Sequence, residues 1–128
     1  MDPTSPTDLP AELRTFLYVC ISSVEQVDLL VQLRRLGTSV TVRQLSTETG
    51  IASPAIRQHL DTLTARGLLE ACAGAEVTYR YAPSTVELRR YADLLAESYG
   101  TQRDAVIRFI SSRAARTFAD AFTLRKKP

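Results

Sequence analysis

Residues 41–69, TVRQLSTETGIASPAIRQHLDTLTARGLL, decide the fold. Thr41 suits a helix N-cap, and Gly50 suits the left-handed turn that ends a helix, so we predict a helix over 42–49. Ser53 suits the N-cap of a further helix, and Pro54 suits the first turn of that helix. They predict another helix over about 54–66, with Gly67 after its end. The stretch therefore predicts two short helices around a glycine turn, followed by a strand.

The second of these helices has two unlike sides. Ile56, Leu60 and Leu63 recur at spacings of four and three, which places them on one apolar face. His59 borders that face and is expected to pack or hydrogen-bond there. The opposite, exposed side carries the residues Pro54, Arg57, Gln58, Asp61 and Ala65.

Two further helices are predicted before this stretch. Residues 1–7 hold two prolines and, after Met1, no apolar side chain, which predicts a disordered lead-in. An N-terminal helix over about 10–21, within a segment 8–23, has Asp8 as its expected cap. The next helix starts after Ser22 or Ser23 and ends at Gly37. The β-branched sequence TSVTV then predicts one short strand.

A β-hairpin is predicted after the stretch, over about 68–82. The sequences LLEACA and EVTYRYA read as two strands of about six residues around Gly74. Val77, Tyr79 and Tyr81 alternate with polar residues, so we expect them on the packed face. The predicted class is mainly α with a small β-hairpin wing, over 24–82, with extra helices at both ends.

Residues 83–128 are predicted to be helical. An apolar stripe at spacings of three and four predicts a helix over 85–111, up to about 28 residues long. Gly100 costs about 1 kcal/mol in a helix interior and could split it. A short final helix is expected over 114–122, before the basic tail LRKKP.

The order of these elements, with Gly50, Ile51, Ile56, Leu60 and the run RGLL, resembles a known arrangement. It is similar to the winged helix-turn-helix of bacterial transcription regulators of the MarR and ArsR types, over about residues 24–82. The resemblance implies a DNA-binding regulator whose helix over 54–66 enters the major groove of double-stranded DNA.

The resemblance also implies which residues meet DNA. Arg57 could grip guanine, and Gln58 could pair with adenine. Asp61 weighs against this reading, because its carboxylate repels phosphates and could hold Arg57, four residues away, in a surface pair. The expected DNA-binding set is Thr41, Arg43, Ser53, Pro54, Arg57, Gln58, Asp61 and Arg80.

The long C-terminal stripe suggests a homodimer, because one small winged domain leaves much of such a stripe uncovered. Two copies would meet a palindromic site. The alternative is that the stripe folds back within the monomer. A small-molecule effector could sit where the first helix meets helix 85–111, although no residue pattern names one. The expected dimerisation set is Leu13, Phe16, Leu17, Leu88, Tyr91, Leu95, Val106 and Phe109.

The charge leaves a second function open. The net charge is +2, but residues 41–82 carry four arginines against four acidic residues, and residues 83–128 carry nine Lys or Arg against five acidic residues. A nucleic-acid-binding surface is expected to be basic. The neutral region therefore keeps a winged-helix protein-interaction module without DNA binding as the alternative.

Catalysis, metals and membranes find little support in the sequence. We predict no enzyme and no cofactor, because the chain has one histidine and no glycine-rich phosphate loop. Cys20 and Cys72 lie far apart and are expected to be reduced thiols, not metal ligands. The chain lacks a long apolar run and begins without a signal peptide, which predicts a cytoplasmic protein with no membrane partner.

Overall fold

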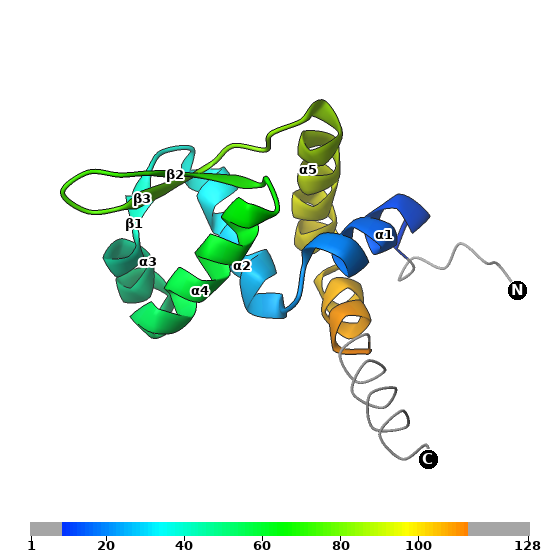
Figure 1. Cartoon of the computed structure of the whole chain (residues 1–128). Helices are drawn as coiled ribbons and strands as arrows, with labels where there is room; N and C mark the ends of the chain where they lie inside the picture. Colours follow the sequence, from blue (N-terminus) through cyan, green and yellow to red (C-terminus); the bar gives the residue numbers. More distant parts are fainter. Residues whose placement is uncertain (1–8, 113–128) are drawn as a thin grey trace, which may run out of the picture.

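The computed structural model describes residues 9–112. The predicted lead-in over 1–7, the predicted cap Asp8 and the predicted final helix over 114–122 lie outside the described residues. The elements in chain order are α1 (Ala11–Cys20), α2 (Val24–Leu36), β1 (Val40–Thr41), α3 (Val42–Thr49), α4 (Ser53–Ala65), β2 (Leu69–Cys72), β3 (Thr78–Tyr81) and α5 (Val86–Thr101) (Figure 1). The predicted class, mainly helical with a small β wing, is confirmed.

Helix α3 and the turn after it form as predicted. The Thr41 hydroxyl accepts from the backbone N–H of Gln44, and the Gln44 side chain accepts from the backbone N–H of Thr41. This reciprocal capping box satisfies two backbone donors at the start of the helix. Gly50 follows the last turn with φ of 77°. Glycine adopts this left-handed conformation without a Cβ clash, so the chain reverses directly into α4.

The start of α4 differs from the prediction. Ala52 is the N-cap residue, Ser53 is the first helical residue, and no side chain caps the helix. Pro54 occupies the first turn, where its missing N–H costs nothing. The predicted cap role of Ser53 is therefore wrong. At the other end, Arg66 is the C-cap residue and Gly67 follows with φ of 84°.

The three strands form one antiparallel sheet in the order β1–β3–β2. Val40 and Ala71 flank Tyr79 in register on its two sides. Each arm of the hairpin has four residues, so the predicted six per arm is wrong. Val77 lies in the connecting loop with 38% of its surface exposed, so its expected packing is wrong as well. Strand β3 begins at Thr78, so Val77 is not part of the strand and does not follow its alternation of packed and exposed side chains.

Helices α1 and α5 are shorter than predicted. Helix α1 begins at Ala11, with Pro10 as a capping residue that lends no side-chain hydrogen bond. Helix α5 ends at Thr101, and helix resumes over residues 103–112. The interruption is at Gln102, which has φ of −131° and ψ of 45°, whereas Gly100 stays helical. A single uninterrupted helix over 85–111 is therefore wrong, and the question whether Gly100 splits it is answered, because the helix continues through Gly100 and breaks at Gln102.

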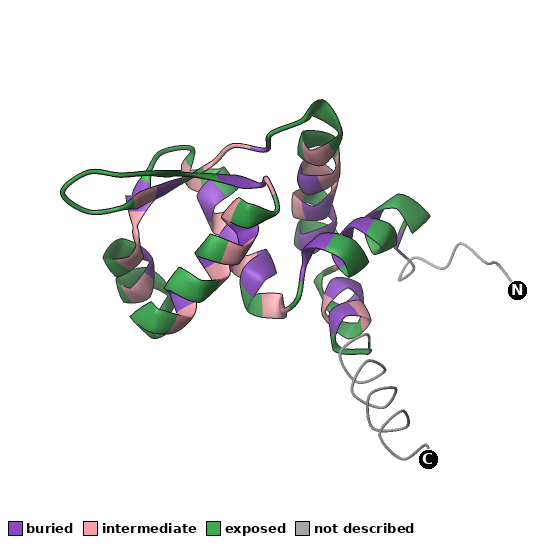
Figure 2. Cartoon of the chain, in the orientation of Figure 1, coloured by how far each residue is buried: buried purple, intermediate pink, exposed green. Residues whose placement is uncertain are grey.

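The buried face of each helix turns toward a shared core (Figure 2). Ile56, Leu60 and Leu63 of α4 are fully buried, as predicted. Helix α1 packs against α5 (Figure 1). Leu95, Ser98 and Val106 of the C-terminal apolar stripe are buried inside the one chain. Among the described residues, no single helix is long and apolar enough to cross a membrane, and the pair α1 and α2, which would suffice together, is bent by 105°.

Candidate nucleic-acid interface

The outward side of α4 forms an open groove of about 490 Å³. It brings together four of the residues expected at DNA, namely Pro54, Arg57, Gln58 and Asp61. All four side chains are exposed. The large apolar side chains that are exposed in the described part of the chain lie on other elements. The groove therefore holds no large apolar side chain and is mixed in charge, with one cation and one anion a helical turn apart. Its lining residues are Pro54, Arg57, Gln58, Asp61, Thr62 and Ala65.

Asp61 is bonded to the wing and not to Arg57. The Tyr79 hydroxyl donates to Asp61 Oδ1 over 2.6 Å. Within residues 41–82, Arg57 is the one arginine without a hydrogen bond or ion pair to another described residue. Of the two readings that the sequence left open, the structure favours the one in which Arg57 is available to a ligand.

Tyr79 is a functional candidate that the sequence analysis treated only as a packing residue. It lies in the central strand of the sheet with 3% of its surface exposed. Burial raises the pKa of Tyr79 to about 12, and the hydrogen bond to Asp61 adds to the shift. The hydroxyl therefore keeps its proton at neutral pH and acts as a permanent donor. The alternation along β3 signalled its inward direction, but nothing in the sequence signalled its partner.

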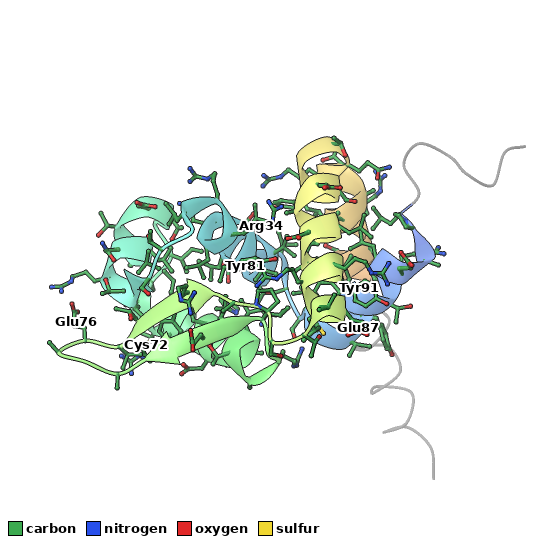
Figure 3. All side chains as sticks on the ribbon, turned by 90° about the horizontal axis from the view of Figure 1, so that it is seen from above. Arg34, Cys72, Glu76, Tyr81, Glu87 and Tyr91 are labelled. Carbon is green, nitrogen blue, oxygen red and sulfur yellow. The ribbon has the colours of Figure 1, made fainter. Side chains whose placement is uncertain are left out.

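The two flanking arginines are held by carboxylates. Arg43, in the first turn of α3, pairs with Glu76 in the loop of the hairpin over 2.6 Å. Arg80 pairs with Glu70, which lies directly opposite on β2. Figure 3 shows Glu76 at the far tip of the wing. Because Tyr79 reaches α4, the alternation of the strand directs Arg80 to the other face of the sheet. Arg80 therefore does not join Arg57 in the groove.

Thr41 and Ser53 lie at the starts of the two helices. The hydroxyl of Thr41 is already used in the capping box of α3. Ser53 is exposed at the start of α4, where no side chain caps the backbone N–H groups. These exposed donors and the positive end of the helix dipole suit an anion such as a phosphate. Ser53 is thus the better placed of the two for a phosphate contact.

A hydrogen-bond chain fixes α4 against the start of α2. The buried Gln26 accepts from the backbone N–H of Ser22 over 2.8 Å, and its amide nitrogen lies 3.4 Å from His59 Nδ1. His59 Nε2 lies 2.8 Å from a carboxylate oxygen of Glu25. Since the Gln26 amide donates to Nδ1, the neutral ring carries its proton on Nε2 and donates it to Glu25. The expected packing and hydrogen-bonding role of His59 is confirmed.

A second chain of contacts ties the wing to α5. Tyr81 and Arg34 both donate to Asp93 Oδ1, over 3.0 and 2.9 Å, and Figure 3 shows their side chains between α2 and α5. Burial would raise the pKa of Asp93, but these two donors outweigh it and lower that pKa. Tyr99 of α5 donates to Asp28 of α2. These hydrogen bonds therefore connect both the wing and α2 to α5.

An apolar groove of about 530 Å³ lies beside the contact between α1 and α5 and is lined by both helices. Phe16, Val19, Cys20, Leu88 and Tyr91 contribute to its lining (Figure 3 labels Tyr91). Cys20 is buried there, and burial raises the pKa of its thiol. Tyr18 and Val19 on α1 are 56% and 61% exposed, and Val86 at the start of α5 is 82% exposed.

The expected dimerisation residues divide into two groups. Leu13, Leu17, Leu95 and Val106 are fully buried within the single chain. For Leu95 and Val106, which belong to the C-terminal stripe, this burial favours the alternative that the stripe folds back within the monomer. For Leu13, Leu17 and Leu95, which lie on α1 and α5, this burial is consistent with the packing of α1 on α5. Leu88, Tyr91 and Phe109 are only half-buried, and Phe16 is buried but lines the groove.

The comparisons with known proteins agree with this geometry. Residues 22–76 match the model of the MarR family. No curated protein and no solved structure matches the chain. The matched segment covers α2, the helix-turn-helix of α3 and α4, and the hairpin as far as Glu76. Over residues 22–76 the chain is therefore similar to the winged-helix domain of the MarR family, whose members are typically DNA-binding transcription regulators.

Proposed function

We propose that this chain is a transcription regulator that places α4 in the major groove of double-stranded DNA. The observation that carries the proposal is Arg57, a cation on the outward side of α4 that makes no hydrogen bond or ion pair with another described residue. Guanine presents two acceptors, O6 and N7, that match the two parallel donors of a guanidinium. Gln58 beside it can pair with adenine in the same way. Pro54 and Ser53 bring the start of the helix close to the DNA.

The flanking contacts in this proposal are to phosphates. Arg43 at the start of α3 and Arg80 on the wing each exchange a carboxylate for a phosphate when DNA binds. Exposed ion pairs contribute about 0–1 kcal/mol, so Glu76 and Glu70 give up these arginines at small cost. Thr41 and Ser53 contribute hydroxyl or backbone donors. These contacts position the helix and carry no base preference by themselves.

The proposed assembly is a homodimer on a palindromic site. The half-buried residues Leu88, Tyr91 and Phe109, and the exposed Val19 beside Phe16, leave apolar surface on α1, α5 and residues 103–112. A second copy covers this surface and brings two α4 helices to half-sites about 10 base pairs apart. Such a regulator acts in the cytoplasm, where bacterial DNA lies. An effector would meet this same region, but no residue pattern identifies one.

Duplex titration with salt tests the proposal. The full chain is titrated into labelled random duplex DNA at low salt, and the binding constant is then measured as salt rises. Neutralised phosphates release counterions, so the logarithm of the binding constant should fall linearly with the logarithm of the salt concentration. Absence of any salt-sensitive binding would falsify the proposal.

The second candidate remains a winged-helix protein-interaction module. It is favoured by the equal numbers of arginines and acids in residues 41–82, and by the pairing of Arg43 and Arg80 with glutamates. A docking helix usually presents a contiguous apolar patch. The outward side of α4 exposes Arg57, Gln58 and Asp61 and no large apolar side chain, which favours DNA as the partner. Binding to a protein with no DNA binding at any salt concentration would select the second candidate.

A further inference from the structure

Asp61 is an unexpected residue on a surface that meets a polyanion. It lies one helical turn after Arg57 on the exposed side of α4. At 3.4 Å per base pair, a helical turn of about 6 Å corresponds to roughly two base pairs. Its carboxylate would be repelled by phosphates, and it does not compensate by neutralising Arg57. A carboxylate in this place is compatible with DNA contact where the DNA offers it a hydrogen-bond donor.

Tyr79 fixes the direction of this carboxylate. Tyr79 is buried and is paired with strands on both sides, so its side chain is held in place. Its pKa is about 12, so the hydroxyl keeps its proton and remains a hydrogen-bond donor. It occupies Oδ1 of Asp61. The second oxygen makes no hydrogen bond to any described residue. Because the side chain is ordered before DNA arrives, binding costs less conformational entropy.

The base edges of the major groove differ in what they offer a carboxylate. Guanine offers two acceptors, and thymine offers one acceptor beside a methyl group. Adenine offers a donor, but its N7 acceptor lies next to it and repels the second oxygen. Cytosine offers its N4 amino group as a donor. A fixed carboxylate therefore accepts cytosine and rejects the other three bases.

We propose that Asp61, oriented by Tyr79, selects a cytosine within about two base pairs of the guanine that Arg57 reads. This inference rests on the proposed function and names part of its operator. Asp61 is then a specificity-determining residue, and Tyr79 is a positioning residue. The repulsion between Asp61 and phosphates also weakens binding to unrelated DNA, which raises the ratio of specific to non-specific affinity.

Selection from a random duplex pool tests the proposal. It uses the full chain as wild type and as the variants Asp61→Asn and Tyr79→Phe. The Glu97→Gln variant, which removes one negative charge from an exposed position of α5, is the matched control. The wild type should enrich a half-site with a guanine and a cytosine at the stated spacing. Glu97→Gln should enrich the same half-site.

Asp61→Asn should keep the guanine and replace the cytosine by adenine, because an amide offers the donor and acceptor that adenine matches. Fluorescence anisotropy on the two duplexes should show a change in relative affinity of roughly tenfold. Tyr79→Phe should keep the same bases but lower the preference for cytosine several-fold. Thermal unfolding of each variant shows whether it folds, and a merely structural role for Tyr79 would weaken all duplexes alike.

Three outcomes go against the inference. An unchanged half-site for Asp61→Asn, or an equal gain in affinity for every duplex, would show that the carboxylate only repels phosphates. An unchanged cytosine preference for Tyr79→Phe would remove Tyr79 from the mechanism. In these cases the proposed DNA binding stands. If the wild type enriches nothing and binds no DNA, the proposed function itself fails.

Discussion

At the scale of the residue, Arg57 decides whether α4 reads DNA. The substitution Arg57→Ala should weaken binding to the selected half-site about tenfold or more and relax the preference for guanine. The folded state should lose less than about 0.5 kcal/mol, because Arg57 is exposed and bonds to no described residue. Anisotropy titration and thermal unfolding measure the two effects. Arg14→Ala on the exposed side of α1 is the control and should change neither.

The sequence predicts which residues share the outward side of α4 but not which of them are paired. The helical spacing places Arg57 and Asp61 a turn apart and allows an ion pair between them. The partner of Asp61 is Tyr79, which follows 18 residues later. That contact depends on the path of the hairpin over α4, which local spacing does not encode. For the same reason, the pairing of Arg43 with Glu76 could not be predicted.

At the scale of the element, three tyrosine–aspartate hydrogen bonds join the wing, α4, α5 and α2. Burial, aided by the aspartates, raises the pKa of Tyr79, Tyr81 and Tyr99 from 10.0 to about 12. Below pH 10 these phenols are protonated in both the folded and the unfolded chain. Between pH 10 and 12 only the unfolded chain releases the protons, so its free energy falls relative to the folded state. Stability should therefore decline through this window.

Chemical unfolding at pH 9 and at pH 11.5 measures this decline. The double variant Tyr81→Phe and Tyr99→Phe removes two of the three groups and should lose less stability between the two pH values than the wild type. It should be less stable than the wild type at pH 9, because Asp93 and Asp28 lose a donor. An equally steep decline in the variant would contradict this account of the tyrosines.

The turn between α4 and β2 depends on Gly67. A Cβ at this position would lie 2.7 Å from Ser84 Oγ and 3.3 Å from Leu88 Cδ1, in a backbone with φ of 84°. Gly50 has a similar φ but open space around it. We expect Gly50→Ala to cost about 1 kcal/mol for the left-handed backbone alone and Gly67→Ala to cost about 1 kcal/mol more. Thermal unfolding compares them, and equal losses would refute the steric part.

Local chemistry explains which elements the sequence predicts well. The Thr41 cap and Gly50 define α3 to the residue, because both signals act within a few residues. The break near the end of α5 is different. Gly100 has the lower helix propensity, yet the chain leaves the helix at Gln102. Propensity is a weak signal that tertiary packing overrides, and here Ser98 and Tyr99 are buried against the rest of the protein.

At the scale of the whole molecule, the exposed apolar residues of α1 and α5 should mediate the homodimer. Val19→Glu places a charge on the edge of the groove between these helices and should shift the equilibrium toward the monomer. Analytical ultracentrifugation measures the association. Val77→Glu, in the loop of the wing, is the matched control and should leave the association unchanged. If the Val19→Glu variant dimerises as strongly as the wild type, the dimer interface does not include this surface.

The central claim is that two copies of α4 read base edges in the major groove. Selection of bound sequences by the wild-type chain from a random duplex pool, followed by a salt titration of the winning duplex, tests it most directly. The account predicts an inverted repeat with half-sites about one helical turn apart, each with a guanine, and an affinity that falls steeply with salt. A pool with no enriched sequence, and no salt-sensitive binding to any duplex, would contradict it.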